Sequence, residues 1–196
     1  TLEDATALAR QMVRIGLGMG RKVRAVLTDM DEPLGQWIGN AVEVQESIDT
    51  LQGRGPADLV EVVTALAAEL LVMTGKAADE AAAVKLLTSA ISSGQAFDRF
   101  TRMVVAQGGK PGCWERLPQA QEHEVYKATS AGVLAGVDCE ASGRAAVRLG
   151  AGRETKDSVL DLSAGLRMRV RRGQPVDVGT PLVELVHNDP RRAVAA

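Results

Sequence analysis

Cysteine is scarce in this chain of 196 residues. Its two cysteines, Cys113 and Cys139, form no C-x-x-C pair and lie at no spacing with histidine that would suit zinc. A disulfide framework and a structural zinc site are therefore excluded as the basis of the fold. Hydrophobic residues make up 45% of the sequence and charged residues 24%, which is the balance of a soluble globular protein.

A large net charge and long apolar runs are also lacking. The formal net charge is -2, which gives no electrostatic reason to expect a nucleic-acid partner or binding to an acidic membrane. No stretch resembles a signal peptide or a transmembrane helix. We therefore expect a cytoplasmic protein without a membrane or nucleic-acid partner. Its length allows one large or two small domains.

The sequence contains no recognisable catalytic motif. Its two histidines, His123 and His187, have no obvious nucleophile beside them, and no serine lies in a G-x-S-x-G pattern. Both histidines are interpreted as surface or hydrogen-bonded residues. The run 16–20 has the spacing G-x-G-x-G and follows an expected helix, so it predicts a helix end and a return turn, not a dinucleotide-binding loop. We therefore name no catalytic residue in this chain.

Residues 17–46 contain the best candidate for a binding site. The apolar, β-branched run 23–28 predicts a buried core strand, and the acids, proline and glycine of 29–35 predict a turn after it. Asn40, with Glu43 three residues later, predicts the capped start of a helix that continues to Leu51. Loops at the carboxyl ends of strands are frequent ligand sites in α/β proteins.

The predicted turn contains three acidic side chains, those of Asp29, Asp31 and Glu32. Acids clustered in a loop suit a hard cation such as Mg²⁺. A turn stabilised by capping carboxylates uses the same residue types and needs no metal. The sequence leaves both interpretations open.

Helical periodicity dominates the first half of the chain. It predicts helices over residues 2–15, 57–73, 78–91 and 94–107, and the second of these should be deeply packed because apolar residues nearly encircle it. The inward face of the last helix is expected to consist of Phe97, Phe100, Met103 and Val104. Glycine and proline between residues 108 and 118 predict a linker.

Short strands dominate beyond this linker. They are predicted at residues 124–129, 132–137, 159–162, 166–170, 176 and 181–186, with a short helix over 142–149. This pattern predicts a small β-rich second domain.

Several segments resemble the pyrimidine-nucleoside and thymidine phosphorylases. The first is Leu27-Thr-Asp-Met-Asp-Glu-Pro-Leu-Gly35 together with Gly39-Asn-Ala-Val-Glu-Val-Gln-Glu46. Further matches follow in the same order at 103–109, 149–156, 161–165 and 172–182, so the resemblance covers nearly the whole chain. In this family a helix comparable to residues 2–15 lies in the middle of the polypeptide. The resemblance therefore implies that the chain is the C-terminal part of a longer enzyme.

The same resemblance implies an α/β fold class. The expected architecture is the C-terminal part of a mixed α/β nucleoside-phosphorylase domain, followed by a small β-rich α+β domain with a barrel-sandwich, hammerhead-like element at residues 171–182. The expected division is a partial central α/β domain at residues 1–108, a linker at 109–122 and the family's C-terminal domain at 123–196.

The resemblance also implies a site for a potassium-like monovalent cation. Carried over to this sequence, its ligands are the backbone carbonyls of Leu34 and Trp37 and the carboxylate of Glu46. Oxygen donors suit a hard cation. Trp37 replaces a smaller residue common in the family; a carbonyl ligand tolerates this change, although the bulk could alter the loop. The family's remaining ligands come from a phosphate loop for which this chain has no counterpart.

The activity implied by the resemblance is reversible phosphorolysis, a pentosyl transfer in pyrimidine nucleotide salvage. Inorganic phosphate is the co-substrate; it displaces the base of a pyrimidine nucleoside and leaves a pentose 1-phosphate. The family's phosphate- and base-binding motifs precede the segment that matches Thr1, so the chain alone is expected to be inactive. The family is homodimeric through an N-terminal helical domain that has no counterpart here. A preference for thymidine or uridine is not readable from this sequence.

Two alternatives follow from other resemblances. The run 171–182 is similar to the hammerhead of biotinyl and lipoyl carriers, which would make the chain a non-catalytic carrier-like or assembly domain. Its candidate attachment sites, Lys127 and Lys156, lack the expected Met-Lys-Met or Asp-Lys context. An anthranilate phosphoribosyltransferase relative would share the fold of the first region, but that family has no counterpart of residues 123–187.

Overall fold

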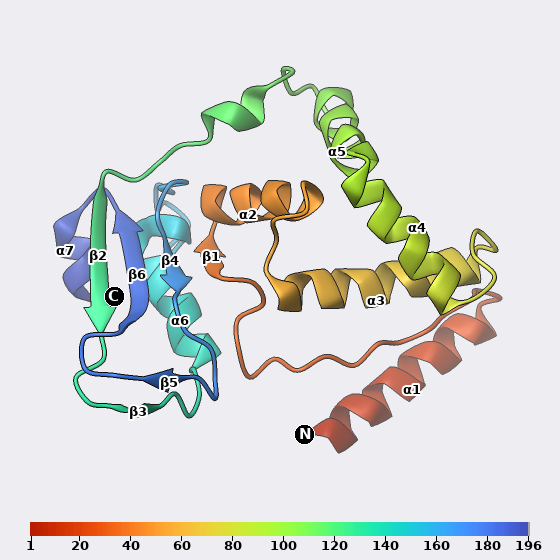
Figure 1. The fold of residues 1–196 in the computed structure, drawn as a ribbon, viewed down its shortest axis with the longest axis horizontal. Helices are drawn as coiled ribbons and strands as arrows, with labels where there is room; N and C mark the ends of the chain where they lie inside the picture. Colours follow the sequence, from red (N-terminus) through yellow and green to blue (C-terminus); the bar gives the residue numbers. More distant parts are fainter. Residues whose placement is uncertain (196) are drawn as a thin grey trace.

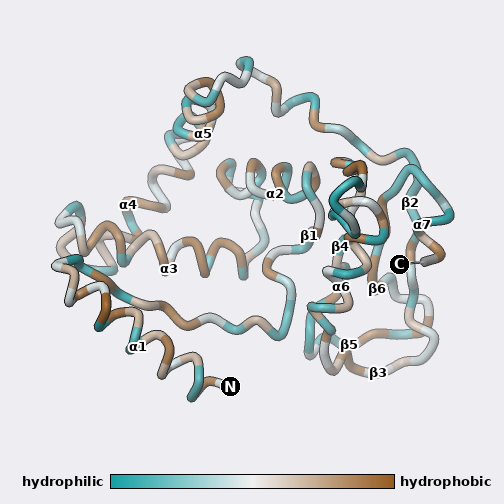
Figure 2. The backbone as a smooth tube through the Cα atoms, turned by 180° about the vertical axis from the view of Figure 1, so that it is seen from behind, coloured by the Kyte–Doolittle hydropathy of each residue, from teal (hydrophilic) through white to brown (hydrophobic). Residues whose placement is uncertain are grey.

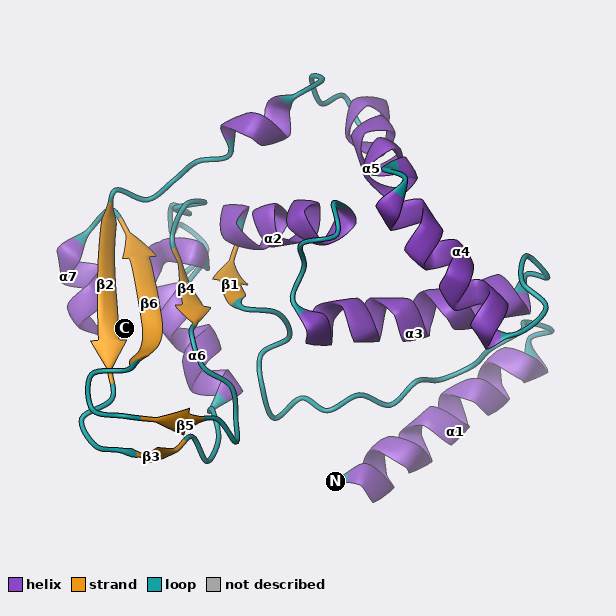
Figure 3. Ribbon diagram, in the orientation of Figure 1, coloured by secondary structure: helices purple, strands orange, loops and turns teal. Residues whose placement is uncertain are grey.

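The computed structural model describes residues 1–195 as two regions connected by a linker (Figure 1). The first region is mostly helical, and the second is a small sheet with helices packed against it (Figure 3). The helices are α1 (Leu2–Gly18), α2 (Ala41–Leu51), α3 (Ala57–Met73), α4 (Glu80–Ser92), α5 (Gln95–Ala106), α6 (Cys139–Ala146) and α7 (Pro190–Ala195), with short helical turns η1 (Cys113–Arg116) and η2 (Val147–Ala151). The strands are β1 (Trp37–Gly39), β2 (Glu122–Lys127), β3 (Gly132–Val133), β4 (Gly165–Met168), β5 (Pro175–Val176) and β6 (Pro181–His187).

The predicted helices of the first half are confirmed, and their ends have local causes. α1 begins with a capping box: the Asp4 amide donates to the Thr1 hydroxyl, and the N-terminal ammonium of Thr1 donates to the Asp4 carboxylate. It continues to Gly18, and Gly20 with φ +71° then reverses the chain, as the glycine spacing predicted. α4 begins where the carboxylate of Asp79 accepts the amide of Ala82 at 2.8 Å.

The main sheet combines strands from both sides of the linker. Its order is β1-β4-β6-β2, and each neighbouring pair is antiparallel. β1 precedes the linker in sequence, yet it pairs with β4, with Trp37 opposite Arg167 and Gly39 opposite Gly165. A second, two-stranded sheet is formed by β3 and β5. The division into domains at residues 108 and 123 stays a prediction.

Two glycines allow β1 and β4 to approach closely. A Cβ atom added to Gly39 would lie 2.7 Å from the carbonyl oxygen of Ala164, and one added to Gly165 would lie 2.6 Å from that of Ile38. Real Cβ atoms do not tolerate such contacts, so these positions require glycine for space. The close approach fixes β1 as the edge strand of the sheet of the second region.

The buried core lies in the second region, between the sheet and the helical segments α6, η2 and α7 (Figure 1). It is aliphatic, and its buried members are Ala146, Leu149, Ala164, Leu166, Met168, Leu185 and Ala193. Ile38 of β1 packs against this cluster. The first region therefore contributes to the core mainly through β1.

Three predictions about strands were wrong or incomplete. Residues 23–28 form no strand: they run as an extended segment near α3, and none of their residues is buried (Figure 3). A strand needs a partner to satisfy its amides and carbonyls, and no described segment pairs with this one. Residues 159–162 are likewise unpaired, and the strand predicted at 132–137 is limited to Gly132–Val133. The short helix starts earlier than predicted, at Cys139, because Asp138 caps it.

The expectation that α3 is deeply packed was also wrong. Its only buried residue is Ala68, and Leu70 is 62% exposed. Apolar residues also recur along α1 (Figure 2). Among them Leu2, Leu8, Met12, Ile15 and Leu17 are exposed. Within residues 1–195 no other element covers these faces fully, so apolar periodicity did not lead to burial here.

The inward face of α5 is confirmed in part. Phe97 and Phe100 pack with Trp114 of the linker, with ring centroids 5.9 Å apart in each case. Met103, expected on the same face, is exposed. The aromatic contacts attach the linker turn η1 to α5.

None of the helices in residues 1–195 combines the length and the apolar character that crossing a bilayer would require.

The loop before β4 is held by Asp161. Its carboxylate accepts hydrogen bonds from the amide and hydroxyl of Ser163 at 3.0 and 2.6 Å and from Asn188 Nδ2 at 2.8 Å. Burial alone would raise the pKa of Asp161, but these hydrogen bonds to Ser163 and Asn188 outweigh it and hold the pKa below the usual value of 3.8. The adjacent Leu162 carbonyl accepts the first amide of α2, from Ala41, at 2.9 Å.

We predict that Asp161→Asn lowers the free energy of unfolding by about 1 kcal/mol at pH 7, since hydrogen bonds to a charged acceptor are lost. The folded-state pKa lies below the unfolded one, so the contribution of Asp161 is present above pH 3.8 and is lost as the pH falls through the folded-state pKa. Urea unfolding followed by circular dichroism, at pH 7 and in acid, measures the loss of unfolding free energy and its dependence on pH. The exposed Asp157, changed to Asn, is the control. A destabilisation independent of pH would contradict this account.

Candidate functional site

The loop 29–35 ends at a turn fixed by two carboxylates. Gly35 has φ +74°, a conformation that favours glycine, and its amide donates to Asp58 Oδ2 at 2.9 Å. The next two amides, of Gln36 and Trp37, donate to Glu46 Oε1 and Oε2 at 2.9 and 3.5 Å. The turn therefore leads directly into β1, and its amides are satisfied by side chains of α2 and α3.

Glu46 is the central residue of this site. It lies on α2 and is only 8% exposed. Burial raises the pKa of its carboxyl, the amide hydrogen bonds from Gln36 and Trp37 lower it, and the nearby acids Asp58 and Glu43 raise it; the net direction is upward. Among residues 1–195 no Lys, Arg or His forms an ion pair with Glu46. A cation bound here would stabilise its charged form.

The three predicted cation ligands meet at one cavity. Leu34, Trp37 and Glu46 all line a cavity of about 490 Å³ between the loop, α2, α3 and α6. The remaining lining includes Ser47 and Cys139. Backbone carbonyls and one buried carboxylate with acidic neighbours are an oxygen-only donor set, which fits a monovalent hard cation. The residues present are thus compatible with the predicted ion.

Trp37 packs within the sheet next to this site. It occupies the first position of β1, opposite Arg167. The guanidinium of Arg167 lies over the indole ring, 5.3 Å from its centroid, and also donates to Gln36 Oε1 at 2.8 Å. The bulky side chain therefore has a defined partner in the sheet.

The helix cap predicted at Asn40 differs in detail. α2 begins at Ala41 and ends at Leu51 as predicted, but the Asn40 side chain makes no capping hydrogen bond. Its Nδ2 donates to the carbonyl of Ala151 at 2.6 Å, in the second region. Glu43 accepts the amide of Gly39 at 2.9 Å, so the capping carboxylate acts one residue earlier than expected. Tertiary contact replaces the local cap.

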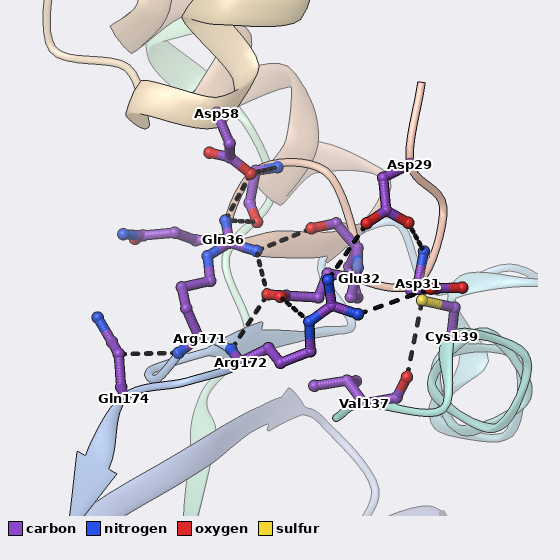
Figure 4. A network of polar contacts seen from close by, with 12 residues as sticks. Asp29, Asp31, Glu32, Gln36, Asp58, Val137, Cys139, Arg171, Arg172 and Gln174 are labelled. Atoms are coloured by element: carbon purple, nitrogen blue, oxygen red, sulfur yellow. Dashed lines mark hydrogen bonds and ion pairs between the residues drawn. The ribbon is translucent and has the colours of Figure 1, made fainter. Parts of the chain in front are cut away.

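Two arginines that the sequence did not single out bind the acidic loop (Figure 4). Arg172 forms ion pairs with Asp29, Asp31 and Glu32, at 3.3, 3.6 and 3.5 Å. The described residues contain no cluster of three or more acid, histidine or cysteine side chains suited to a metal, so the Mg²⁺ interpretation of these acids is not supported. Asp29 also caps the amide of Asp31 at 2.8 Å, as the capping interpretation predicted.

Arg171 contacts both the same loop and Asp58 of α3. Its guanidinium donates to the carbonyl of Pro33 at 2.8 Å, to the carbonyl of Gly35 and to Asp58 Oδ2 at 2.8 Å. The two arginines lie about 140 positions after the loop. The sequence shows two consecutive arginines and, far from them, three acids of opposite charge. Sequence alone gives no reason to bring segments so distant together.

The histidines lie away from this cavity. His123 Nδ1 contacts Glu184 Oε1 at 2.9 Å. His187 is 1% exposed, and its Nε2 contacts Glu124 Oε1 at 3.1 Å. Both are hydrogen-bonded residues of the sheet, as expected, although Nδ1 of His187 has no partner in the described structure.

Comparison with known proteins identifies two matching family models. The model described as "Glycosyl transferase family, a/b domain" matches residues 1–97, and that described as "Pyrimidine nucleoside phosphorylase C-terminal domain" matches residues 133–196. Proteins named pyrimidine-nucleoside phosphorylase from Staphylococcus aureus strains USA300 and COL are 44% identical to the chain over 191 residues. The chain belongs to the pyrimidine-nucleoside phosphorylase family. The protein from strain bovine RF122 is equally similar, at 44% identity.

The family match extends through nearly all of this chain but not through all of its relatives. The aligned part is 96% of the chain and 44% of each of these phosphorylases. The chain therefore spans less than half the length of the curated relatives. Within the phosphorylase match, the candidate cavity is lined by residues from both family-model segments, since Leu34, Trp37 and Glu46 belong to the first and Cys139 to the second.

We predict that Gly35→Ala destabilises the chain and disturbs the cavity. A Cβ atom at this position would lie 2.2 Å from Glu46 Oε2 and would force a φ that alanine rarely adopts. Gly20→Ala is the matched control, because Gly20 has φ +71° but open space around its Cβ position. We expect Gly20→Ala to cost about 1 kcal/mol of unfolding free energy and Gly35→Ala to cost more. Equal losses in chemical denaturation would contradict the clash with Glu46.

Proposed function

We propose that this chain is the C-terminal part of an enzyme that catalyses the phosphorolysis of pyrimidine nucleosides. Support comes from the family membership and from the names of relatives that are 44% identical. The observation that carries the proposal is the cavity at which Leu34, Trp37 and Glu46 meet, since these are the positions where the resemblance places cation ligands. The substrates would be a pyrimidine nucleoside and inorganic phosphate, and the products the free base and a pentose 1-phosphate.

The transition state of this reaction determines which contacts the enzyme must provide. Displacement of the base passes through a transition state with oxocarbenium character, which is helped by a phosphate held close to the anomeric carbon and by donors to the departing base. We assign none of these contacts to residues of this chain. Its part in the reaction is to build one wall of the site through α2, α3 and the loop 29–35.

The proposed cation site belongs to that wall. When bound, a potassium-like ion would supply a positive charge that balances the buried carboxylate and orders the loop. Glu46 would provide one oxygen ligand while its amide contacts with Gln36 and Trp37 keep the carboxylate in place. Leu34 and Trp37 would provide carbonyl ligands.

Finer features of the proposal follow from the family. We propose a cytoplasmic enzyme of pyrimidine nucleotide salvage that acts on thymidine, uridine or both, and that assembles as a homodimer through a part outside this chain. Residues 171–182, with β5 and the turn at Gly173, would form the hammerhead-like element of a barrel-sandwich domain. No nucleic-acid partner is proposed.

The activity is tested by phosphate-dependent release of uracil and thymine, measured by chromatography. We expect the longer protein to release base and the 196-residue chain alone to release none, because the family's phosphate- and base-binding motifs have no counterpart in it. Turnover by the chain alone would contradict its assignment as a non-catalytic part. If neither protein were active, the phosphorolysis proposal would fail and the non-catalytic alternative would remain, tested by a mass shift at Lys127 or Lys156 with a biotin or lipoate ligase.

Binding of the cation is tested by thermal unfolding in potassium chloride. We expect potassium to raise the Tm of the chain above its value in tetramethylammonium chloride at equal ionic strength, because an ion bound only by the folded state stabilises it. Glu46→Gln is expected to abolish this difference. Glu140→Gln, which removes an exposed carboxylate of α6, should preserve it. A potassium-specific increase that survives in Glu46→Gln would exclude Glu46 as a ligand.

A further inference from the structure

Arg171 contacts the backbone carbonyls of the two residues that flank Leu34. It donates to the carbonyl of Pro33, immediately before Leu34, and to that of Gly35, immediately after it. The same guanidinium reaches Asp58, which in turn accepts the amide of Gly35. The backbone that carries the candidate Leu34 ligand is thus held at each neighbouring residue, while Leu34 itself lines the cavity.

The guanidinium suits this task better than other cations would. It is planar, always charged, and presents several donors in fixed directions, so one side chain can bind two carbonyls and a carboxylate at once. Arg171 is about one-quarter exposed, so its contacts are only partly screened by water. A lysine ammonium would supply the charge without the spread of donors.

Charge around the loop gives a second reason for the arginines. Asp29, Asp31, Glu32 and Asp58 lie on or beside it, and Glu46 lies behind it. Without compensation these carboxylates would repel one another and loosen the loop. Arg172 pairs with the three acids of the loop, and Arg171 pairs with Asp58.

We propose that Arg171 is a positioning residue for the candidate cation site: it holds the Leu34 peptide in place, and Arg172 neutralises the acids of the same loop. The proposal rests on the cation site proposed above and adds a role for the C-terminal segment, which contributes no ligand of its own. Affinity for potassium would then depend on two arginines that lie outside the cation's ligand set.

The test measures potassium binding directly by the fluorescence of Trp37. Trp114, the second tryptophan, is replaced by phenylalanine, which keeps an aromatic ring against Phe97 and Phe100. The chain is titrated with potassium chloride at ionic strength held constant with tetramethylammonium chloride. In this background Arg171→Met is compared with Arg171→Lys and with Arg144→Met, which removes an arginine ion pair on α6, far from the loop in sequence.

We expect Arg171→Met to weaken potassium binding about tenfold, the effect of losing charge-assisted hydrogen bonds. Arg171→Lys should restore only part of the affinity, and Arg144→Met should leave it unchanged. Hydrogen exchange at the amides of Gly35 and Gln36 should be faster in Arg171→Met and unaffected in Arg144→Met, because Asp58 and the loop lose their shared anchor.

The outcomes separate the two proposals. Equal potassium affinity in Arg171→Met and Arg144→Met would overturn the positioning role and leave the cation site standing. A parent chain with no potassium-specific response would overturn the cation site and this dependence together. If Arg171→Met fails to fold by circular dichroism, Asp58→Asn decides, since it removes the carboxylate partner of Arg171 while leaving the arginine in place; unchanged affinity there would overturn the proposal.

Discussion

The amides of Gln36 and Trp37 donate hydrogen bonds to the Glu46 carboxylate, and these bonds position the strand through which the two parts of this molecule are joined. They fix the turn that follows Gly35 and direct the chain into β1. β1 then pairs with β4, so a strand from the helical region completes the sheet of the second region. Burying the Glu46 carboxylate costs free energy, and these amide donors offset that cost only in part. The pKa of Glu46 is therefore still raised. A cation site at this position has a physical reason: it would remove the remaining penalty.

Long-range charge pairing completes the arrangement around Glu46. Arg171 and Arg172 reach across about 140 sequence positions to a loop that has no strand or helix of its own. Exposed ion pairs are individually weak, but here one guanidinium also binds two backbone carbonyls, and that geometry is specific. The loop therefore depends on the C-terminal segment for its conformation. Arg171 and Arg172 thereby take part in shaping the wall of the cavity that Leu34, Trp37 and Glu46 line.

The helical region has a different balance of forces. α1 and α3 show large apolar faces to solvent, and their residues 2–18 and 57–73 have almost no buried side chain. Burial of a leucine contributes roughly 1.5–3 kcal/mol, so helices exposed in this way gain little from packing within the described chain. The extended run 23–28 agrees with this picture, since its β-branched residues have no strand beside them.

Local chemistry was readable from the sequence, because it acts between neighbours along the chain. Helix limits, the turn at Gly20 and the capping role of Asp79 follow from spacing and from side chains that bond to nearby amides. The family resemblance added Leu34, Trp37 and Glu46, and tertiary structure placed all three at one cavity. Pairing, burial and charge compensation were decided only by the tertiary structure. Residues 23–28 have strand composition but no partner, α3 has a core composition but no cover, and Asn40 bonds to Ala151 instead of its own helix. Each of these outcomes depends on which segment, distant in sequence, packs beside the residue in the folded chain. The order of residues along the chain does not by itself show which segments come together.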